Sequence, residues 1–136
     1  MDDRAIKTLI HQTGINPLGL DWRRFVVIVD EQERVLACGQ IKPHGDGSRE
    51  LASLAVEPGS RGRGLARQMI EHLTAGQPPP LYLTCRDELQ PLYEKFGFQV
   101  LALEEMPPYF RRLARLVNLL TRALRMKERM LVMRRG

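Results

Sequence analysis

The sequence predicts one domain with a mixed α/β fold, in which helices flank a mainly antiparallel sheet. Runs rich in strand-forming residues come first, at 24–30, 34–42 and 50–56, and a helical period follows Pro58. A short apolar run at 81–85 comes after that helix. A strand, a helix and a strand in this order form a crossover that makes neighbouring strands parallel, so the predicted sheet is mixed.

The first half of the chain is predicted to form one short helix and three antiparallel strands. Residues 3–13 carry apolar side chains at helical spacing, and Gly14 ends that pattern. The first two strands are separated by the polar residues 31–33, which fits a hairpin. The turn-rich segment 43–48 then leads into the third strand, so we expect an antiparallel meander.

The second half is predicted to alternate helices with short strands. The helix after residue 64 places Leu65, Met69 and Leu73 on one stripe and ends near Gly76. The later predicted elements are a helix with Pro91 in its first turn and its stop at Gly97, a strand at 98–103, an amphipathic helix at 107–126 and a last short strand at 130–133.

The composition favours a cytoplasmic protein without a metal site. Of its 136 residues, 43% are hydrophobic, which suffices for a single core. We expect no membrane span and a cytoplasmic location, because the chain has no run of ~18 apolar residues and its acidic start differs from a signal peptide. Cys38 and Cys85 lack CxxC spacing, which indicates free thiols. The histidines His11, His44 and His72 show no metal-ligand spacing.

The net charge of +5 is unevenly distributed. Residues 106–136 hold nine Lys or Arg and one Glu (+8), whereas residues 1–105 hold twelve basic and fifteen acidic residues (−3). A nucleic-acid-binding domain would carry positive charge on its body, so we expect no nucleic-acid partner. The basic helix at 107–126 allows three roles: a cover over the sheet, a self-association seam of a homodimer, or a patch for a membrane surface or an acidic partner.

A glycine-punctuated basic segment opens the helix after residue 64. It reads SRGRGLARQMI over 60–70, with Arg61, Gly62 and Gly64 near its start. A helix N-terminus offers unpaired backbone N–H groups and partial positive charge, and glycines let a phosphate approach the backbone. The segment matches neither the Walker A loop nor the dinucleotide fingerprint. It predicts either another kind of phosphate site or the solvated start of an ordinary helix.

Two motifs resemble the GNAT superfamily of N-acetyltransferases. The first, similar to the family's motif A pattern Q/R-x-x-G-x-G/A, is Arg61-x-x-Gly64-x-Ala66, which follows an apolar strand and opens a helix. The second, LYEKFGF at 92–98, resembles the family's LYxKxGF segment. The resemblance covers 24–105 and the final strand, and it implies a GNAT-type sheet in a single acetyltransferase domain spanning 1–136.

The chain departs from the family pattern at two places. Its N-terminal part is shorter than the strand and two helices that usually precede the hairpin, and it has an extra helix before the last strand. Part of the usual wall around the acceptor would then have to come from another element. Tyr109 and Phe110, at the start of the extra helix, are candidates for that role.

The resemblance implies that the donor is acetyl-coenzyme A. The pyrophosphate would rest on backbone N–H groups from Gly62 to Ala66. The pantetheine arm would pair with the end of the preceding strand, where the N–H of Val56 would donate to the thioester carbonyl. The predicted donor-binding residues are Leu54, Ala55, Val56, Arg61, Gly62, Arg63, Gly64, Leu65 and Ala66.

Glu50 is the predicted general base. It lies six residues before Val56, the offset at which a strand glutamate acts as base in some GNAT members, and strand alternation places it on the face of Ala52, Leu54 and Val56. Apolar neighbours would raise its pKa, which suits a base near neutral pH. It could instead be a strand-edge glutamate paired with an arginine or facing solvent. Water or another residue would then be the base.

Tyr93 is the predicted general acid, since a tyrosine at this place in the family commonly protonates the departing thiolate. A neutral phenol can donate a proton at neutral pH. Tyr93 also neighbours the apolar stripe of its helix and could simply pack in the core. Cys85 ends the strand before that helix, but direct transfer in the family makes a nucleophilic role unexpected.

These assignments predict an N-acetyltransferase that acts by direct attack of a primary amine on acetyl-coenzyme A. The acceptor would be a small-molecule or peptide amine, whose identity leaves no motif. The alternative is a non-catalytic module that binds coenzyme A, or an adaptor that binds a partner through its basic C-terminal helix.

Overall fold

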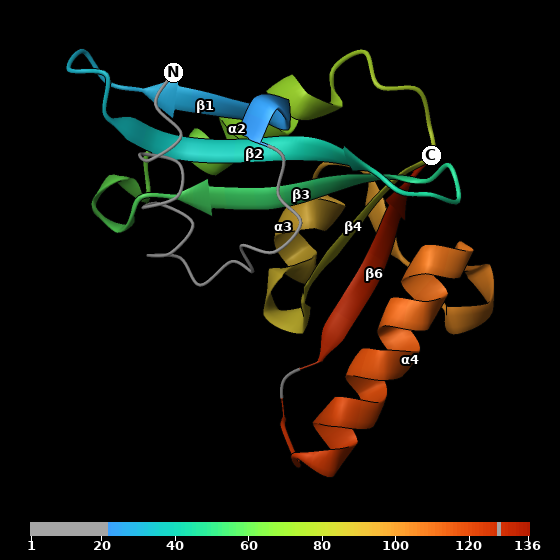
Figure 1. The fold of residues 1–136 in the computed structure, drawn as a ribbon. Coiled ribbons are helices and arrows are strands. Elements are labelled where there is room, and N and C mark those ends of the chain that lie inside the picture. Colours follow the sequence, from blue (N-terminus) through green and yellow to red (C-terminus); the bar gives the residue numbers. More distant parts are fainter. Residues whose placement is uncertain (1–21, 128) are drawn as a thin grey trace. The chain divides into compact units, whose positions relative to one another are not determined.

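The computed structural model describes residues 22–127 and 129–136, so the predicted helix at 3–13 lies outside the described residues. Its strands and helices are β1 (Phe25–Val29), β2 (Val35–Pro43), β3 (Arg49–Val56), α2 (Leu65–Thr74), β4 (Leu81–Arg86), α3 (Gln90–Glu94), β5 (Phe98–Val100), α4 (Pro108–Ala123) and β6 (Met130–Arg135). Short 3-10 helices are Trp22–Arg24, Pro58–Ser60, Asp87–Leu89 and Leu103–Glu105. The six strands are mostly antiparallel, and the predicted mixed α/β class is confirmed (Figure 1).

The described chain divides into two compact units. The first holds residues 22–42 and 51–77, and the second holds 43–50 and 78–136. Most of β3 belongs to the first unit, whereas its first two residues belong to the second.

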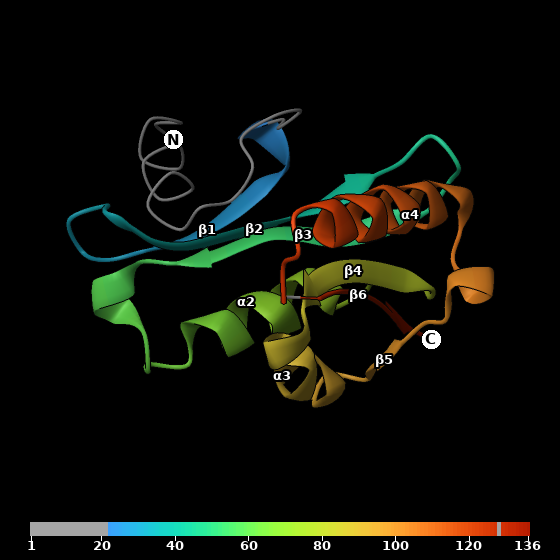
Figure 2. The same ribbon diagram turned by 90° about the horizontal axis from the view of Figure 1, so that it is seen from below.

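The first unit is a three-stranded meander with one helix against it. β1 and β2 pair antiparallel, with Phe25 opposite Gln40, and the N–H of Asp30 donates to the carbonyl of Arg34 at 3.0 Å to close the turn. α2 lies along one face of these strands (Figure 2). It packs closely on β2 at Gly39, where a Cβ would come within 2.7 Å of Leu73 Cδ1. The predicted hairpin and helix are confirmed.

A left-handed residue interrupts β3 within this unit. Ser53 has φ +57°, although left-handed backbone is unfavourable for residues other than glycine. Gln40 of the neighbouring strand donates from Nε2 to Ser53 Oγ at 2.9 Å. Strict alternation of side chains therefore does not run through β3, and the expectation that one face continues from Ala52 to Leu54 and Val56 fails at this point.

The second unit contains the predicted crossover pairing. Glu50 of β3 lies opposite Tyr82 of β4 in a parallel pair, as expected of a strand, helix and strand in this order. β4 then pairs antiparallel with β6, and β6 with β5. α3 and α4 lie on opposite faces of these strands (Figure 2). The core on the α4 side consists of Tyr82, Leu101, Met106, Phe110, Ala114 and Val132.

One prediction for the second unit needs correction, and one of the three roles left open for the basic helix is met only in part. The strand expected at 98–103 ends at Val100, because Leu103–Glu105 turn into a 3-10 helix in which Glu105 Oε1 accepts the N–H of Ala102 at 3.0 Å. The basic helix covers the unit only with its first half. Phe110 and Ala114 are buried, whereas the apolar side chains toward its end are exposed, Leu124 to 68%.

Among the helices that the structure describes, none combines the length and the apolar character that a membrane span requires.

Candidate active site

The predicted phosphate site is an open turn in the first unit. Residues 61–64 are exposed, and α2 begins at Leu65 with Gly64 as its N-cap. Glycine has no side chain to cap the helix, and no side-chain cap is present. The first N–H groups of a helix have no partner within the helix, so this end of α2 offers donors to an anion.

The two glycines of the turn are required by their backbone conformation. Gly62 has φ +84° and Gly64 has φ +75°, values that side chains rarely allow. A Cβ at either position would meet nothing within 4 Å. The backbone of the turn is thus open on the side where a Cβ would point, and these residues fit a phosphate group. The guanidinium groups of Arg61 and Arg63 add positive charge beside it.

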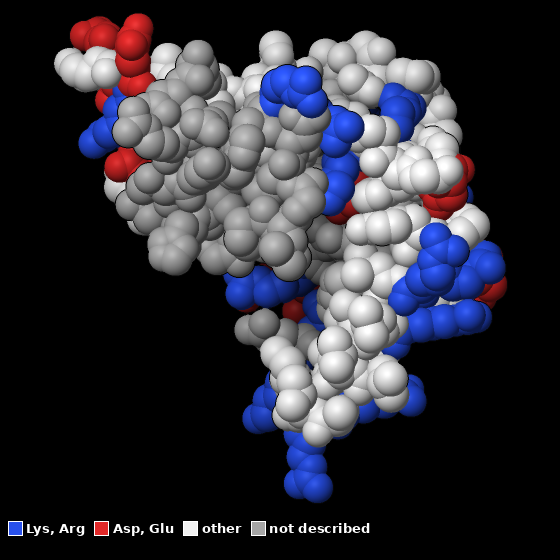
Figure 3. All heavy atoms as spheres, in the orientation of Figure 1, with Lys and Arg blue, Asp and Glu red and all other residues white. Residues whose placement is uncertain are grey.

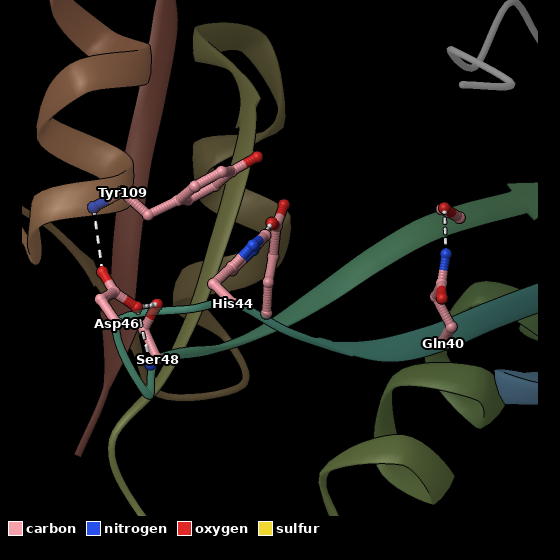
Figure 4. A network of polar contacts seen from close by, with 7 residues as sticks. Gln40, His44, Asp46, Ser48 and Tyr109 are labelled. Carbon is pink, nitrogen blue, oxygen red and sulfur yellow. Dashed lines mark hydrogen bonds and ion pairs between the residues drawn. The ribbon is translucent and has the colours of Figure 1, made fainter. Parts of the chain in front are cut away.

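Glu50 forms a close pair with His44 in the second unit. His44 Nε2 lies 2.7 Å from Glu50 Oε1, and both side chains are largely covered. The predicted base is therefore a buried carboxylate, since Glu50 is only 8% exposed. Its close partner is polar, whereas the strand pattern suggested apolar neighbours. Figure 4 shows the imidazole and the residues around it.

Aromatic rings enclose the His44 imidazole. The Tyr109 ring stacks on it with centroids 3.6 Å apart, and the Phe110 ring meets it edge-on at 5.4 Å. Tyr109 was expected near the acceptor, and the structure places it on His44 (Figure 4). Burial raises the pKa of the Tyr109 phenol, and the charge of Glu50 adds to that shift.

Asp46 fixes the start of α4 from the turn between β2 and β3. Asp46 Oδ2 accepts the N–H of Tyr109 at 2.9 Å, and Oδ1 accepts both the N–H and the hydroxyl of Ser48 (Figure 4). Pro107 and Pro108 at the helix start cannot supply a side-chain cap. The Ser48 and Tyr109 bonds lower the pKa of the Asp46 carboxyl to about 2.

Tyr93 lies in α3, and its side chain is buried. Its ring meets Phe98 edge-on with centroids 6.2 Å apart. Burial raises the pKa of Tyr93 to about 12, and the neighbouring Cys85 adds to the shift. The phenol keeps its proton at neutral pH, as a general acid must. The same burial also fits the alternative of a core tyrosine.

The two thiols are poorly suited to nucleophilic attack. Burial raises the pKa of Cys38 to about 12 and that of Cys85 to about 11. Cys38 Sγ donates to the carbonyl of Ser53 at 3.5 Å, and Cys85 Sγ lies 3.7 Å from Met133 Sδ. Neither is a thiolate at neutral pH. Across residues 22–127 and 129–136, no three His, Cys, Asp or Glu side chains are grouped to hold a metal ion.

The contact of His44 with Glu50 was not predicted from the sequence, where His44 is one of three scattered histidines. The turn-rich segment at 43–48 could have indicated this contact, because a tight turn brings the residues on its two sides close together. The N–H of His44 donates to the carbonyl of Ser48 at 2.9 Å, which brings the two strand ends together. The long-range cap by Asp46 left no sequence signal, because its partner is 63 residues away.

A comparison with known protein families shows the family of this chain. A model described as an acetyltransferase (GNAT) domain matches residues 21–100, more than half of the chain. The chain therefore belongs to the GNAT acetyltransferase family. A search of the curated proteins finds no match.

Solved structures share the fold. N-acetylglutamate synthase from Neisseria gonorrhoeae, complexed with coenzyme A and N-acetyl-glutamate, superimposes with a TM-score of 0.66 at 19% identity over 98% of this chain and 32% of that one. Rv2747 from Mycobacterium tuberculosis, in complex with CoA and NLQ, superimposes with a TM-score of 0.68 at 17% identity, over 96% of this chain and 92% of that one. A GNAT-family acetyltransferase from Staphylococcus aureus superimposes with a TM-score of 0.61 at 12% identity, over 96% of this chain and 87% of that one. The GNAT-type fold predicted from the sequence is confirmed.

The lengths of these proteins differ. The chain spans about a third of the N-acetylglutamate synthase chains that it matches, and most of the other two.

Proposed function

We propose that this chain transfers an acetyl group from acetyl-coenzyme A to a primary amine by direct attack, without a covalent enzyme intermediate. The observation that carries the proposal is the open, positive-φ glycine turn at the uncapped start of α2, in a chain that belongs to the GNAT family. An uncapped helix start with flanking arginines binds phosphates well, and coenzyme A carries a pyrophosphate.

The donor-binding groups are those that the resemblance implies. Backbone N–H groups from Gly62 to Ala66 hold the pyrophosphate, with Arg61 and Arg63 beside it. The pantetheine arm runs along Leu54, Ala55 and Val56, and the Val56 N–H stabilises the negative charge that develops on the thioester oxygen. The donor supplies an activated acetyl group, and the protein supplies position and charge.

Glu50 takes a proton from the acceptor ammonium, which makes the amine nucleophilic. The nitrogen lone pair forms the new C–N bond, the C–S bond breaks, and its electron pair leaves with the sulfur of coenzyme A. Tyr93 donates a proton to that sulfur and recovers one from water. The second amine proton leaves to water, so that atoms and charges balance.

The test measures release of the coenzyme A thiol with a chromogenic thiol reagent. The amine panel contains L-glutamate, putrescine and a lysine-containing peptide. L-glutamate is included because N-acetyl-glutamate is bound to the N. gonorrhoeae structure. We expect turnover with at least one amine, and losses of about 10² or more in kcat for Glu50→Gln and Tyr93→Phe.

Tyr82→Phe is the matched control, because it also removes a hydroxyl from a buried tyrosine of the second unit. It should leave kcat nearly unchanged. Equal losses in Tyr82→Phe and Tyr93→Phe would show that Tyr93 acts through packing. Absence of thiol release with every amine would count against the proposed reaction.

A second candidate function is that of an adaptor, and the exposed apolar side chains toward the end of α4 support it. The end of α4 exposes Leu116, Leu119, Leu120 and Leu124, and Leu119 is 65% exposed. Residues 108–127 contain six basic and no acidic residues. Figure 3 shows white side chains bordered by blue basic groups at the end of this helix. An amphipathic face of this kind suits an acidic helical partner, as the adaptor alternative requires.

The adaptor alternative predicts binding without chemistry. A Leu119→Glu and Leu120→Glu double variant should release an acidic partner while coenzyme A binding stays intact. An enzyme that does not use this surface would keep its full turnover in the same variant, so thiol release and partner capture separate the two functions.

A further inference from the structure

The His44 imidazole occupies a site that the proposed reaction has so far left unused. It is held between Glu50 at 2.7 Å and the stacked ring of Tyr109, with Phe110 at its edge. Its side chain is only 5% exposed. Three elements contribute to this arrangement: the turn after β2, the first residues of β3 and the start of α4.

We propose that His44 is a positioning residue for Glu50, and that its protonation decides when Glu50 can take the proton of the acceptor amine. This inference rests on the proposed function, and it adds a residue and a pH dependence to it. His44 itself need not touch the substrate.

The positioning follows from the hydrogen-bonding roles. An ionised carboxylate only accepts hydrogen bonds, so the nitrogen next to Glu50 Oε1 carries the hydrogen and donates. The stacked Tyr109 ring prevents the imidazole from turning, and Asp46 holds the Tyr109 backbone at 2.9 Å. One carboxylate oxygen is thus occupied by His44.

The protonation effect follows from charge. When the imidazole is neutral, it offers Glu50 one hydrogen bond. When it is protonated, it forms a full ion pair, which stabilises the carboxylate and makes it a weaker base. Glu50 then accepts the ammonium proton less readily, so acetyl transfer should fall when the pH drops far enough to protonate His44.

The surroundings of His44 contain several other titratable groups. Glu50 on β3 and Asp46 in the adjoining turn are acidic, and the positive charge of His44 helps to lower the pKa of Asp46. Tyr109 on α4 faces the imidazole, and Tyr82 lies opposite Glu50 on β4. The pKa of Tyr109 is raised, so its phenol stays neutral at neutral and acid pH.

The experiment compares kcat/KM for thiol release against pH in the wild type, His44→Gln and His44→Phe. Glutamine can still donate to Glu50 but does not titrate. Phenylalanine can stack on Tyr109 but neither donates nor titrates. Thermal melts and calorimetric binding of coenzyme A establish that each variant is folded and retains the donor site.

We expect the wild type to lose activity on the acid side of its pH profile. In both variants this limb should move to lower pH, because the titrating charge is gone. His44→Gln should keep kcat within about 10-fold of the wild type at alkaline pH, whereas His44→Phe should lose more because Glu50 loses its donor.

A purely structural His44 would lower the melting temperature and leave the acid limb in place. An identical limb in the wild type and in either folded variant would overturn the proposal while the acetyltransferase function stands. Absence of turnover by the wild type would instead overturn the proposed function, and this role with it.

Discussion

Gly64→Glu should strongly weaken coenzyme A binding while leaving the protein folded. Gly64 lies at the start of α2 with φ +75°, and a Cβ there points into open space. A side chain in this left-handed conformation costs about 1–2 kcal/mol, which a domain of ordinary stability tolerates. The new carboxylate would stand where the pyrophosphate is expected to lie.

The charge repulsion sets the size of the effect. Two unit charges 4 Å apart interact by about 1 kcal/mol in bulk water and about 4 kcal/mol near a protein surface. With two phosphate charges, the variant should weaken binding by about 2–8 kcal/mol, which is about 30-fold or more. Gly64→Gln adds a similar volume without charge, so it should weaken binding less.

Gly76→Glu is the matched control at the other end of the same helix. Gly76 has φ +73°, and a Cβ there also meets nothing within 4 Å. The substitution therefore adds similar strain and the same charge, away from the proposed phosphate site. Isothermal titration with coenzyme A should give wild-type affinity for Gly76→Glu and an affinity weaker by about 30-fold or more for Gly64→Glu. Equal affinities in the two variants would refute the assignment of the phosphate site.

Three further predictions concern stability and the thiols. Phe110→Ala removes a fully buried ring from the α4 core and should lower the free energy of unfolding by about 3–5 kcal/mol in urea titrations; a loss below about 1 kcal/mol would contradict the described packing. Asp46 has a depressed pKa, so its stabilising effect is present above its ordinary value of 3.8 and is lost as the pH falls through about 2. Asp46→Asn should therefore melt lower than the wild type at neutral pH, with a difference that disappears at strongly acid pH. Cys85→Ser should leave turnover and its pH profile unchanged in the thiol-release assay, because the thiol has a pKa of about 11, and a large loss of kcat would restore a nucleophilic role for Cys85.

The periodic elements could be predicted from the sequence, because their signals are local. The spacing of Leu65, Met69 and Leu73 indicated α2, and the strand-helix-strand order predicted the parallel pair of Glu50 with Tyr82. The positive φ angles of Gly62 and Gly64 agree with the turn that the motif suggested before the helix. These features depend on residues close together in the chain or on a rule of connection.

The features that were missed depend on contacts between distant residues or on side-chain packing. The stack of Tyr109 on His44 joins residues 65 positions apart, and the backbone bond from Tyr109 to Asp46 spans nearly as many. The left-handed Ser53 gave no signal, since serine is ordinary in strands with standard backbone angles. The apolar stripe of α4 left three roles open for this helix and did not show which part of it would be buried. In the structure, burial stops after Ala114. A periodic pattern does not show how far the surface that covers a helix extends, so this limit could not be predicted.

Transfer of a radiolabelled acetyl group in a single turnover tests the central claim most directly. Excess protein is mixed with labelled acetyl-coenzyme A and the amine that gives thiol release, and protein and small molecules are then separated under denaturing conditions. Direct attack predicts that the label appears in the acetylated amine, that none stays on the protein, and that Glu50→Gln slows its appearance. Label bound to the denatured protein would contradict direct transfer, and label that remains entirely in acetyl-coenzyme A would contradict the proposed acetyltransferase activity.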